Sequence, residues 1–246
     1  MKYRNLVLSI LLLLGVGYIY SKFKINIDRD DKIGELNIIK KYLLNEDDQL
    51  TIEQISAIRK PIIWIHIEYD RNLRKWDSFG SRSSNELNQD YLYLTLRSII
   101  NMCSDYFHVI LIDDNSLTKL LDDWNVDLNK VGNIQKENIR ALGLMKVLYK
   151  YGGILMEPSF ILFKSLSPIY DKILKTGKPS IGEFENDSVD SHIMNFSPSL
   201  KFIGCIKNCD KIYELGKQLE LIVNGDHTNN SKMEGQIGNW LYKKAE

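Results

Sequence analysis

Two patterns of hydrophobic residues alternate along most of the chain. Continuous apolar runs rich in β-branched residues occur at 62–67 and 107–112, and a third begins at Ile154. Such runs are typical of strands that are buried on both faces. Between them, apolar residues recur every three or four positions over 89–102 and 134–150, which predicts two helices with one buried face each. The order strand, helix, strand predicts parallel βαβ units, and therefore an α/β sheet flanked by helices.

Shorter segments on either side follow the same two patterns. Apolar spacing over 33–44 and a possible capping box of Thr51 and Gln54 predict two short helices, in a stalk or outer layer over 25–60 that precedes an α/β domain over 61–246. Within that domain we further expect a short helix over 117–122, another after Pro168, strands over 180–184 and 201–206, a helix over 210–223, and a last helix capped by Ser231 and Glu234 that ends at Lys243.

The first 24 residues have a different pattern. Residues 6–20 carry no charge and are flanked by two basic residues on each side. A helix of this length reaches roughly 22 Å, short of a ~30 Å hydrocarbon core, although neighbouring residues can extend it. Because no A-x-A-like cleavage site follows, we expect an uncleaved signal-anchor that crosses a membrane through residues 5–21, its orientation left open. The protein would then be a single-pass membrane protein with a lumenal domain if it enters a secretory pathway, and N-x-S triplets at Asn186, Asn195 and Asn229 are compatible with this.

Composition narrows the classes of function. The chain has 246 residues, of which 44% are hydrophobic, enough for one large domain or two small ones with a full core. Lys plus Arg and Asp plus Glu both number 32, so the net charge excludes a basic nucleic-acid-binding protein. Cys103, Cys205 and Cys209 form no zinc pattern. Cys205 and Cys209 are close enough to form a disulfide if the backbone is looped there, but buried free thiols are favoured.

Two glycines and an acidic residue mark the end of the longest predicted helix. Gly152 and Gly153 can adopt left-handed or crowded backbone conformations, and so they end this helix. Glu157 follows at the far end of a short apolar segment. This spacing could place Glu157 at the lip of the sheet, where α/β proteins bind ligands.

Two further segments contain residue types suited to ligand binding. Asp113 and Asp114 follow the second strand directly, where they could accept hydrogen bonds from a ribose or base or help to hold a metal; alternatively they cap the next helix, and each interpretation can apply to a different residue. Residues 68–88 form a long polar loop in which 79–84 could wrap a phosphate with backbone amides and Arg82. The alternative for this loop is a solvated segment with capping serines.

The run Leu148-Tyr149-Lys150-Tyr151-Gly152-Gly153-Ile154, with Pro61-Ile62-Ile63-Trp64 and the strand that ends in Asp113-Asp114, resembles a known family. It is similar to the bacterial capsular polysaccharide synthesis proteins and related sugar transferases with an Asp-any-Asp motif. The resemblance covers roughly 61–166. It implies a GT-A type, Rossmann-like, mostly parallel sheet that binds a nucleotide sugar, and transfer of the sugar to a glycan or other acceptor.

In this family two carboxylates after the Tyr-Gly-Gly turn hold Mn²⁺ or Mg²⁺, which neutralises the departing diphosphate. Here Glu157 occupies the first position and Ser159 the second, with Pro158 between them, so one charge is missing. The preceding helix normally carries an Asp and an Arg, but Ala141 and Leu144 stand at those positions. Arg140 is one helical turn out of register.

We therefore expect catalytic residues among Glu157, Asp113 and Asp114, metal ligands in Glu157 and Asp114, and donor-binding residues among Gly152, Gly153, Ser159, Arg82 and Arg140. Three interpretations stay open. The chain is a working glycosyltransferase, which uses a metal or basic side chains such as Arg140 and Arg82; or it is a binding or scaffolding module without transfer activity; or the glycine turn is an ordinary helix end that leads into a core strand.

Overall fold

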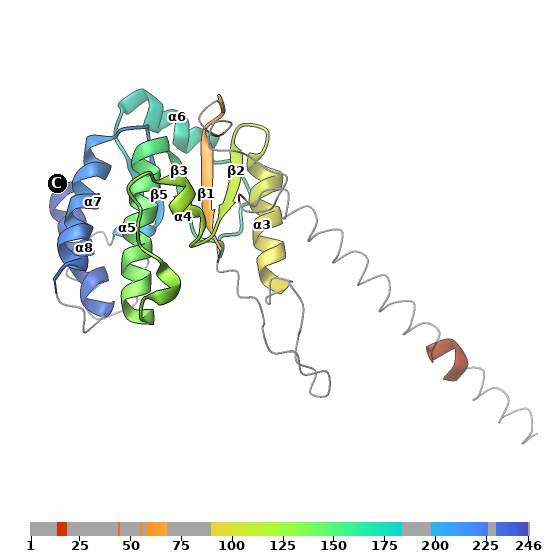
Figure 1. Cartoon of the computed structure of the whole chain (residues 1–246). Helices are drawn as coiled ribbons and strands as arrows, with labels where there is room; N and C mark the ends of the chain where they lie inside the picture. Colours follow the sequence, from red (N-terminus) through yellow and green to blue (C-terminus); the bar gives the residue numbers. More distant parts are fainter. Residues whose placement is uncertain are drawn as a thin grey trace, which may run out of the picture. The chain divides into compact units, whose positions relative to one another are not determined.

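The computed structural model describes residues 14–18, 44, 55, 58–67, 90–183, 198–225 and 230–245 (Figure 1). The chain divides into two compact units, residues 1–41 and 42–246. Of the first unit, residues 14–18 are described, and they are helical and exposed. Within the described part of the chain, every helix is too short or too polar to cross a bilayer. Most of the predicted anchor over 5–21 lies outside the described residues, so the anchor stays a prediction.

The second unit contains a five-stranded mixed sheet with the strand order β2-β1-β3-β5-β4. β1 (Ile62–His66) is central to its parallel half and pairs with β2 (His108–Ile112) and β3 (Gly153–Met156). β5 (Pro198–Cys205) runs antiparallel to both β3 and β4 (Ser180–Glu183). Four strands therefore point one way and β5 the other, which confirms the predicted α/β class with a mostly parallel sheet.

Helices cover both faces of this sheet (Figure 1). α5 lies on one face together with α7 and α8, and α3 lies on the other. The bounds are α3 (Asp90–Cys103), α4 (Ser116–Leu120), the 3-10 helix η1 (Leu128–Lys130), α5 (Asn133–Tyr151), α6 (Ser167–Thr176), α7 (Asp210–Val223) and α8 (Asn230–Ala245). The predicted helix over 210–223 is confirmed at both ends, and the predicted helices over 89–102, 117–122, 134–150, after Pro168 and at the end of the chain differ by a few residues at their termini. The two short helices predicted over 33–44 and from Thr51 lie almost entirely outside the described residues and stay predictions.

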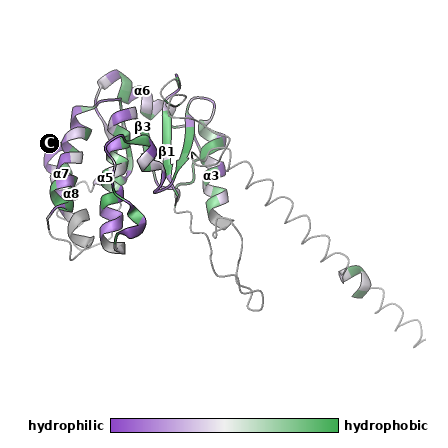
Figure 2. Cartoon of the chain, viewed as in Figure 1, coloured by the Kyte–Doolittle hydropathy of each residue, from purple (hydrophilic) through white to green (hydrophobic). Residues whose placement is uncertain are grey.

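The main core lies between the sheet and α5, α7 and α8. Alternate strand residues such as Trp64, Leu155 and Ile203 pack there with one another and with the apolar stripes of the helices. Figure 2 shows β1 coloured mostly as hydrophobic, whereas α5 contains both hydrophilic and hydrophobic colours. Leu44 and Ile55, which the sequence placed in the stalk, are buried in this same core. The segment before β1 thus contributes to the α/β unit.

The turn between α5 and β3 is crowded by backbone. Gly152 ends α5 with φ 71°, and its N–H donates to the carbonyl of Leu148 at 2.8 Å. A Cβ on Gly152 would lie 2.6 Å from the backbone nitrogen of Lys207, and a Cβ on Gly153 (φ 103°) would overlap the carbonyl oxygen of Ile62. The sequence prediction of a crowded glycine turn is confirmed, and its cause is that β3 leaves the helix directly beside β1.

The three cysteines are buried free thiols, as the sequence favoured. Cys205 in β5 and Cys209 before α7 do not form a disulfide. Burial, followed by the nearby Cys209, raises the pKa of the Cys205 thiol well above its ordinary value. Such a thiol is unreactive and serves packing.

Candidate functional site

Polar side chains gather at the carboxyl ends of the parallel strands, on the face that α5 covers. His66 lies two residues after the core residue Trp64, and Glu157 lies two residues after the core residue Leu155. Successive side chains of a strand point to opposite faces, so residues two apart share a face. Because α5 begins at this same edge, its first turns come to lie over His66 and the end of β2.

Asp114 is the centre of the arrangement. Its Oδ1 accepts hydrogen bonds from His66 Nε2 at 2.9 Å and from Arg140 Nε at 2.7 Å. Its Oδ2 accepts from Arg140 Nη2 at 2.8 Å and lies 3.2 Å from Lys136 Nζ. Arg140 therefore binds the carboxylate with two parallel donors, the strongest geometry for this pair. We call these four side chains, His66, Asp114, Lys136 and Arg140, the Asp114 cluster.

The Asp114 cluster is largely shielded from water. The side chains of Asp114 and Arg140 are 14% and 11% exposed, and that of Lys136 is 27% exposed. Desolvation alone would raise the pKa of Asp114, but the hydrogen bonds and charges of His66 and Arg140 outweigh it and hold this pKa far below its ordinary value. Asp114 is consequently a permanent anion that neutralises and orients the surrounding cations.

This depressed pKa predicts a loss of stability in acid. A carboxyl group whose folded pKa lies below its unfolded pKa stabilises the fold above the unfolded value, and the contribution disappears as the pH falls towards the folded value. We expect the free energy of unfolding to decline below about pH 5, where an unfolded Asp begins to take up protons. Urea denaturation between neutral pH and pH 3 measures the decline, and Asp114→Asn should flatten it. An equal slope in both proteins would contradict the role given to Asp114.

The same contacts determine which nitrogen of His66 is basic. Because an ionised carboxylate can only accept, Nε2 of His66 must donate to Asp114. In neutral His66 the lone pair then lies on Nδ1. A histidine held in one tautomer by a carboxylate can take up a proton from a bound hydroxyl group.

Asp113 has a local role. Its Oδ1 accepts from the backbone N–H of Ser116 at 2.8 Å and from the Ser116 hydroxyl at 2.6 Å. Ser116 is the first residue of α4. The capping interpretation is thus confirmed for Asp113, whereas its neighbour Asp114 points into the ionic cluster. The two aspartates that the sequence treated alike have separate functions.

Glu157 lies at the same edge of the sheet but has other partners. Its backbone N–H donates to the carbonyl of Lys201 at 3.1 Å, its Oε2 lies 3.6 Å from Lys201 Nζ, and the Ser159 hydroxyl donates to it at 3.3 Å. Its side chain is 41% exposed. Glu157 and Ser159 are therefore adjacent to one another, as their spacing suggested, and open to solvent.

The predicted metal ligands do not form a ready donor set. Both oxygens of Asp114 are occupied by cationic groups, and Glu157 is paired with Lys201. Across the described residues, no three His, Cys, Asp or Glu side chains are grouped to hold an ion. The arrangement thus fits a salt-bridge role for Asp114 better than ligation of Mn²⁺ or Mg²⁺, and the metal stays a prediction.

The other predicted donor-binding residues are dispersed. Gly152 precedes β3, Gly153 begins it and Glu157 follows it, so the glycines and the acid lie at opposite ends of a strand about 13 Å long. The expectation that Gly152, Gly153 and Glu157 all border one site does not match their positions at opposite ends of β3. Arg82 lies outside the described residues. Of the residues expected to bind the donor, Arg140 reaches the Asp114 cluster.

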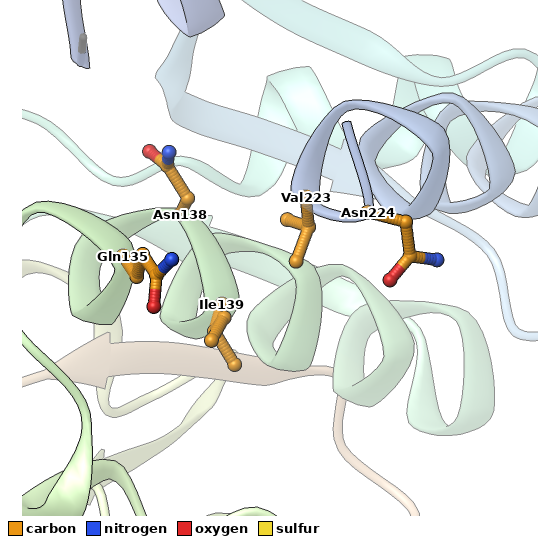
Figure 3. Close-up of a pocket in the computed structure, with 5 residues that line it drawn as sticks. All are labelled: Gln135, Asn138, Ile139, Val223 and Asn224. Carbon is orange, nitrogen blue, oxygen red and sulfur yellow. The ribbon is translucent and has the colours of Figure 1, made fainter. Parts of the chain in front are cut away.

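A small cavity adjoins the first turns of α5 (Figure 3). It has a volume of about 240 Å³ and lies between Gln135, Asn138 and Ile139 of α5 and Val223 and Asn224 at the end of α7. Asn138 is 9% exposed, and no other described residue forms a hydrogen bond with its side chain. Three carboxamides and two aliphatic side chains make this an uncharged, polar cavity between α5 and α7, and no residue of the Asp114 cluster lines it.

Sequence reasoning missed His66, Lys136 and Lys201. The available signal for His66 was a polar residue at the end of an otherwise apolar strand, and for Lys136 its position four residues before Arg140, on the same face of a helix. Lys201 had no comparable signal, because its pairing with Glu157 depends on the antiparallel insertion of β5.

Comparisons with known proteins give limited information. No family model matches the sequence, and no curated protein matches it. Among the solved structures, one described as "PaToxG Glycosyltransferase" is similar, with a TM-score of 0.43 and 13% sequence identity over 89% of this chain and 79% of that one. A likeness of this degree says nothing about catalytic residues, donor or acceptor.

Proposed function

We propose that this chain is a glycosyltransferase that binds a nucleotide sugar at the carboxyl ends of β1, β2 and β3. The observation that supports it best is the Asp114 cluster, in which a buried carboxylate positions Arg140, Lys136 and His66 at the edge where open α/β sheets bind ligands. The GT-A type of fold that the sequence resemblance implies is part of this proposal.

The cluster can stabilise a diphosphate leaving group. In the transfer an acceptor hydroxyl oxygen forms a bond to the anomeric carbon and gives its proton to a base such as His66, while the bond between the anomeric carbon and the diphosphate oxygen breaks and the diphosphate departs with the electron pair. The developing negative charge requires preorganised positive groups. Asp114 carries one negative charge, whereas Lys136 and Arg140 carry two permanent positive charges, so these three side chains together favour an anion.

Lys136 provides the most direct test of this proposal. We expect Lys136→Gln to weaken binding of UDP or GDP about 10- to 150-fold, because a hydrogen bond to a charged group contributes roughly 1.5–3 kcal/mol. Calorimetric titration of the chain with each nucleotide, with and without Mn²⁺, measures the affinity and its metal dependence together. Transfer of a labelled sugar from the corresponding nucleotide sugar to water or to an acceptor is measured separately with the same protein variants.

Lys130→Gln is the matched control. Lys130 lies six residues earlier, its side chain is 83% exposed, and it pairs with Asp127. Its substitution should leave nucleotide affinity unchanged. If neither nucleotide binds under any condition, or if the Lys136 and Lys130 variants bind equally well, the proposed donor site is wrong.

A second candidate function is a binding module of the same fold without transfer activity. The observation that favours it is the pairing of both predicted metal ligands with cations, Asp114 with Arg140 and Glu157 with Lys201. This candidate predicts nucleotide or glycan binding without turnover. Measured sugar transfer that is lost in Lys136→Gln would eliminate it.

A further inference from the structure

A groove on the α5–α7 layer is separate from the Asp114 cluster. Its walls are the second half of α5, the middle of α7 and the segment 121–124, and its volume is about 350 Å³. Small-molecule sites typically have volumes of roughly 300–1,000 Å³. Tyr149 of the groove follows Arg140 by nine residues of the same helix, a rise of about 13 Å. The groove is therefore large enough for one or two sugar rings and distinct from the proposed donor site.

Aromatic side chains line the groove. The rings of Tyr149 and Tyr213 are 5.4 Å apart between centroids and inclined by 45°, and Tyr213 is 51% exposed. Trp124 lines the groove from the segment that follows α4. A partly exposed tyrosine presents an apolar ring face and a polar hydroxyl together. The C–H face and the hydroxyl groups of a pyranose match these two properties.

The charges of the groove cancel. Three lysines and three acids line it, and the lysines pair with two of the acids: Lys150 with Asp122 at 2.8 Å, Lys217 with Glu220 at 2.9 Å and Lys146 with Glu220 at 3.5 Å. A strongly charged ligand would have to compete with these pairs. A neutral ligand rich in hydroxyl groups can instead donate to the carboxylates and accept from the ammonium groups.

Gly216 leaves part of the groove empty. It lies inside α7, where glycine is a poor helix former compared with alanine. A Cβ placed on Gly216 would have no atom within 4 Å, so packing within the described fold does not require glycine here. The absent side chain keeps the groove open between Tyr213 and Glu220.

Trp124 carries an unsatisfied donor in the same place. The residue is 7% exposed, and its indole N–H is buried without a hydrogen-bond partner among the described residues. Buried N–H groups in proteins are nearly always paired with protein, water or ligand. An acceptor supplied by a ligand that reaches this N–H would satisfy it.

We propose that this groove binds a neutral carbohydrate residue, with Tyr213 and Tyr149 against the ring face and the lysine–acid pairs on its hydroxyl groups. This inference goes beyond sugar transfer, since it assigns a second, glycan-binding site on another part of the molecule. It holds whether or not the Asp114 cluster is catalytic.

Saturation-transfer difference NMR on the full chain tests the proposal. The probes are the methyl glycosides of glucose, galactose, mannose and N-acetylglucosamine. The indole N–H signal of Trp124 reports whether the sugar binds in the groove, and this signal is assigned by its absence from the Trp124→Phe variant. We expect saturation transfer from the protein to at least one sugar and a concurrent shift of the Trp124 signal. Gly216→Leu should abolish both, because the new side chain fills the groove while leucine favours the helix.

Gly235→Leu in α8 is the matched control. A Cβ on Gly235 likewise meets no atom within 4 Å, and the residue does not line the groove. This variant should retain sugar binding, as should Lys136→Gln, whereas Gly216→Leu should retain nucleotide binding. The proposal is overturned if no sugar gives saturation transfer, or if the transfer persists in a folded Gly216→Leu protein.

Discussion

Gly153→Ala is expected to destabilise the α/β unit severely. The first atom of the new side chain would overlap the carbonyl oxygen of Ile62, in the parallel strand that pairs with β3, and φ at this position is 103°. Neither the sheet register nor this backbone conformation can relax without the loss of strand pairing. We expect a cost above about 4 kcal/mol, a large part of the 5–15 kcal/mol by which domains are usually stable. Circular dichroism and urea denaturation measure it.

Gly177→Ala separates the cost of the positive φ from the cost of the atomic overlap. Gly177 ends α6 with φ 65°, but a Cβ there meets no atom within 4 Å. Its substitution should therefore carry the cost of the left-handed backbone alone, about 1–2 kcal/mol. If the Gly153 and Gly177 variants were equally stable, overlap with Ile62 would not be what requires glycine at position 153.

The second large effect is expected for Asp114→Ala. This change removes the counter-ion of Arg140 and the acceptor for His66 while both side chains remain shielded from water. Removal of one partner of a buried pair leaves an uncompensated charge, which costs about 3–5 kcal/mol. If the proposed function holds, nucleotide affinity should also fall, because Arg140 loses its fixed orientation. Urea denaturation and calorimetric titration measure the two effects.

Asp122→Ala is the corresponding control. Asp122 pairs with Lys150 at 2.8 Å, but its side chain is 82% exposed. Exposed pairs of this kind contribute about 0–1 kcal/mol. A loss for Asp114→Ala no greater than that for Asp122→Ala would mean that the Asp114 cluster is not the buried network that its geometry indicates.

Much of the fold followed from local patterns. The apolar run at 62–67 and the periodic spacing over 134–150 correctly predicted β1 and α5, because burial on two faces and burial on one face leave different periods in the sequence. The direction of β5 could not be predicted in this way. A buried antiparallel strand has the same local pattern of apolar residues as a buried parallel strand of equal length. The sequence of the segment that precedes β5 does not show in which direction the chain enters the sheet.

The candidate site was predicted less completely. Asp113 and Asp114 were singled out together, yet one caps α4 and the other binds Arg140. Arg140 was considered out of register because it was compared with a family motif. In the structure its side chain donates a hydrogen bond to Asp114, which follows β2 and lies 26 residues earlier in the sequence. Local spacing contains no information about such a pairing.

The sequence by itself determined the strands and helices, the crowded turn at Gly152 and Gly153, and the position of Glu157 at a strand end. These features depend on side-chain periodicity and on backbone conformations that only glycine adopts, which are local properties. Only the tertiary structure decided that His66, Lys136 and Arg140 converge on Asp114, and that Glu157 pairs with Lys201. These contacts join residues from separate strands and helices, and the packing of α5 against the sheet is what brings them within hydrogen-bonding distance.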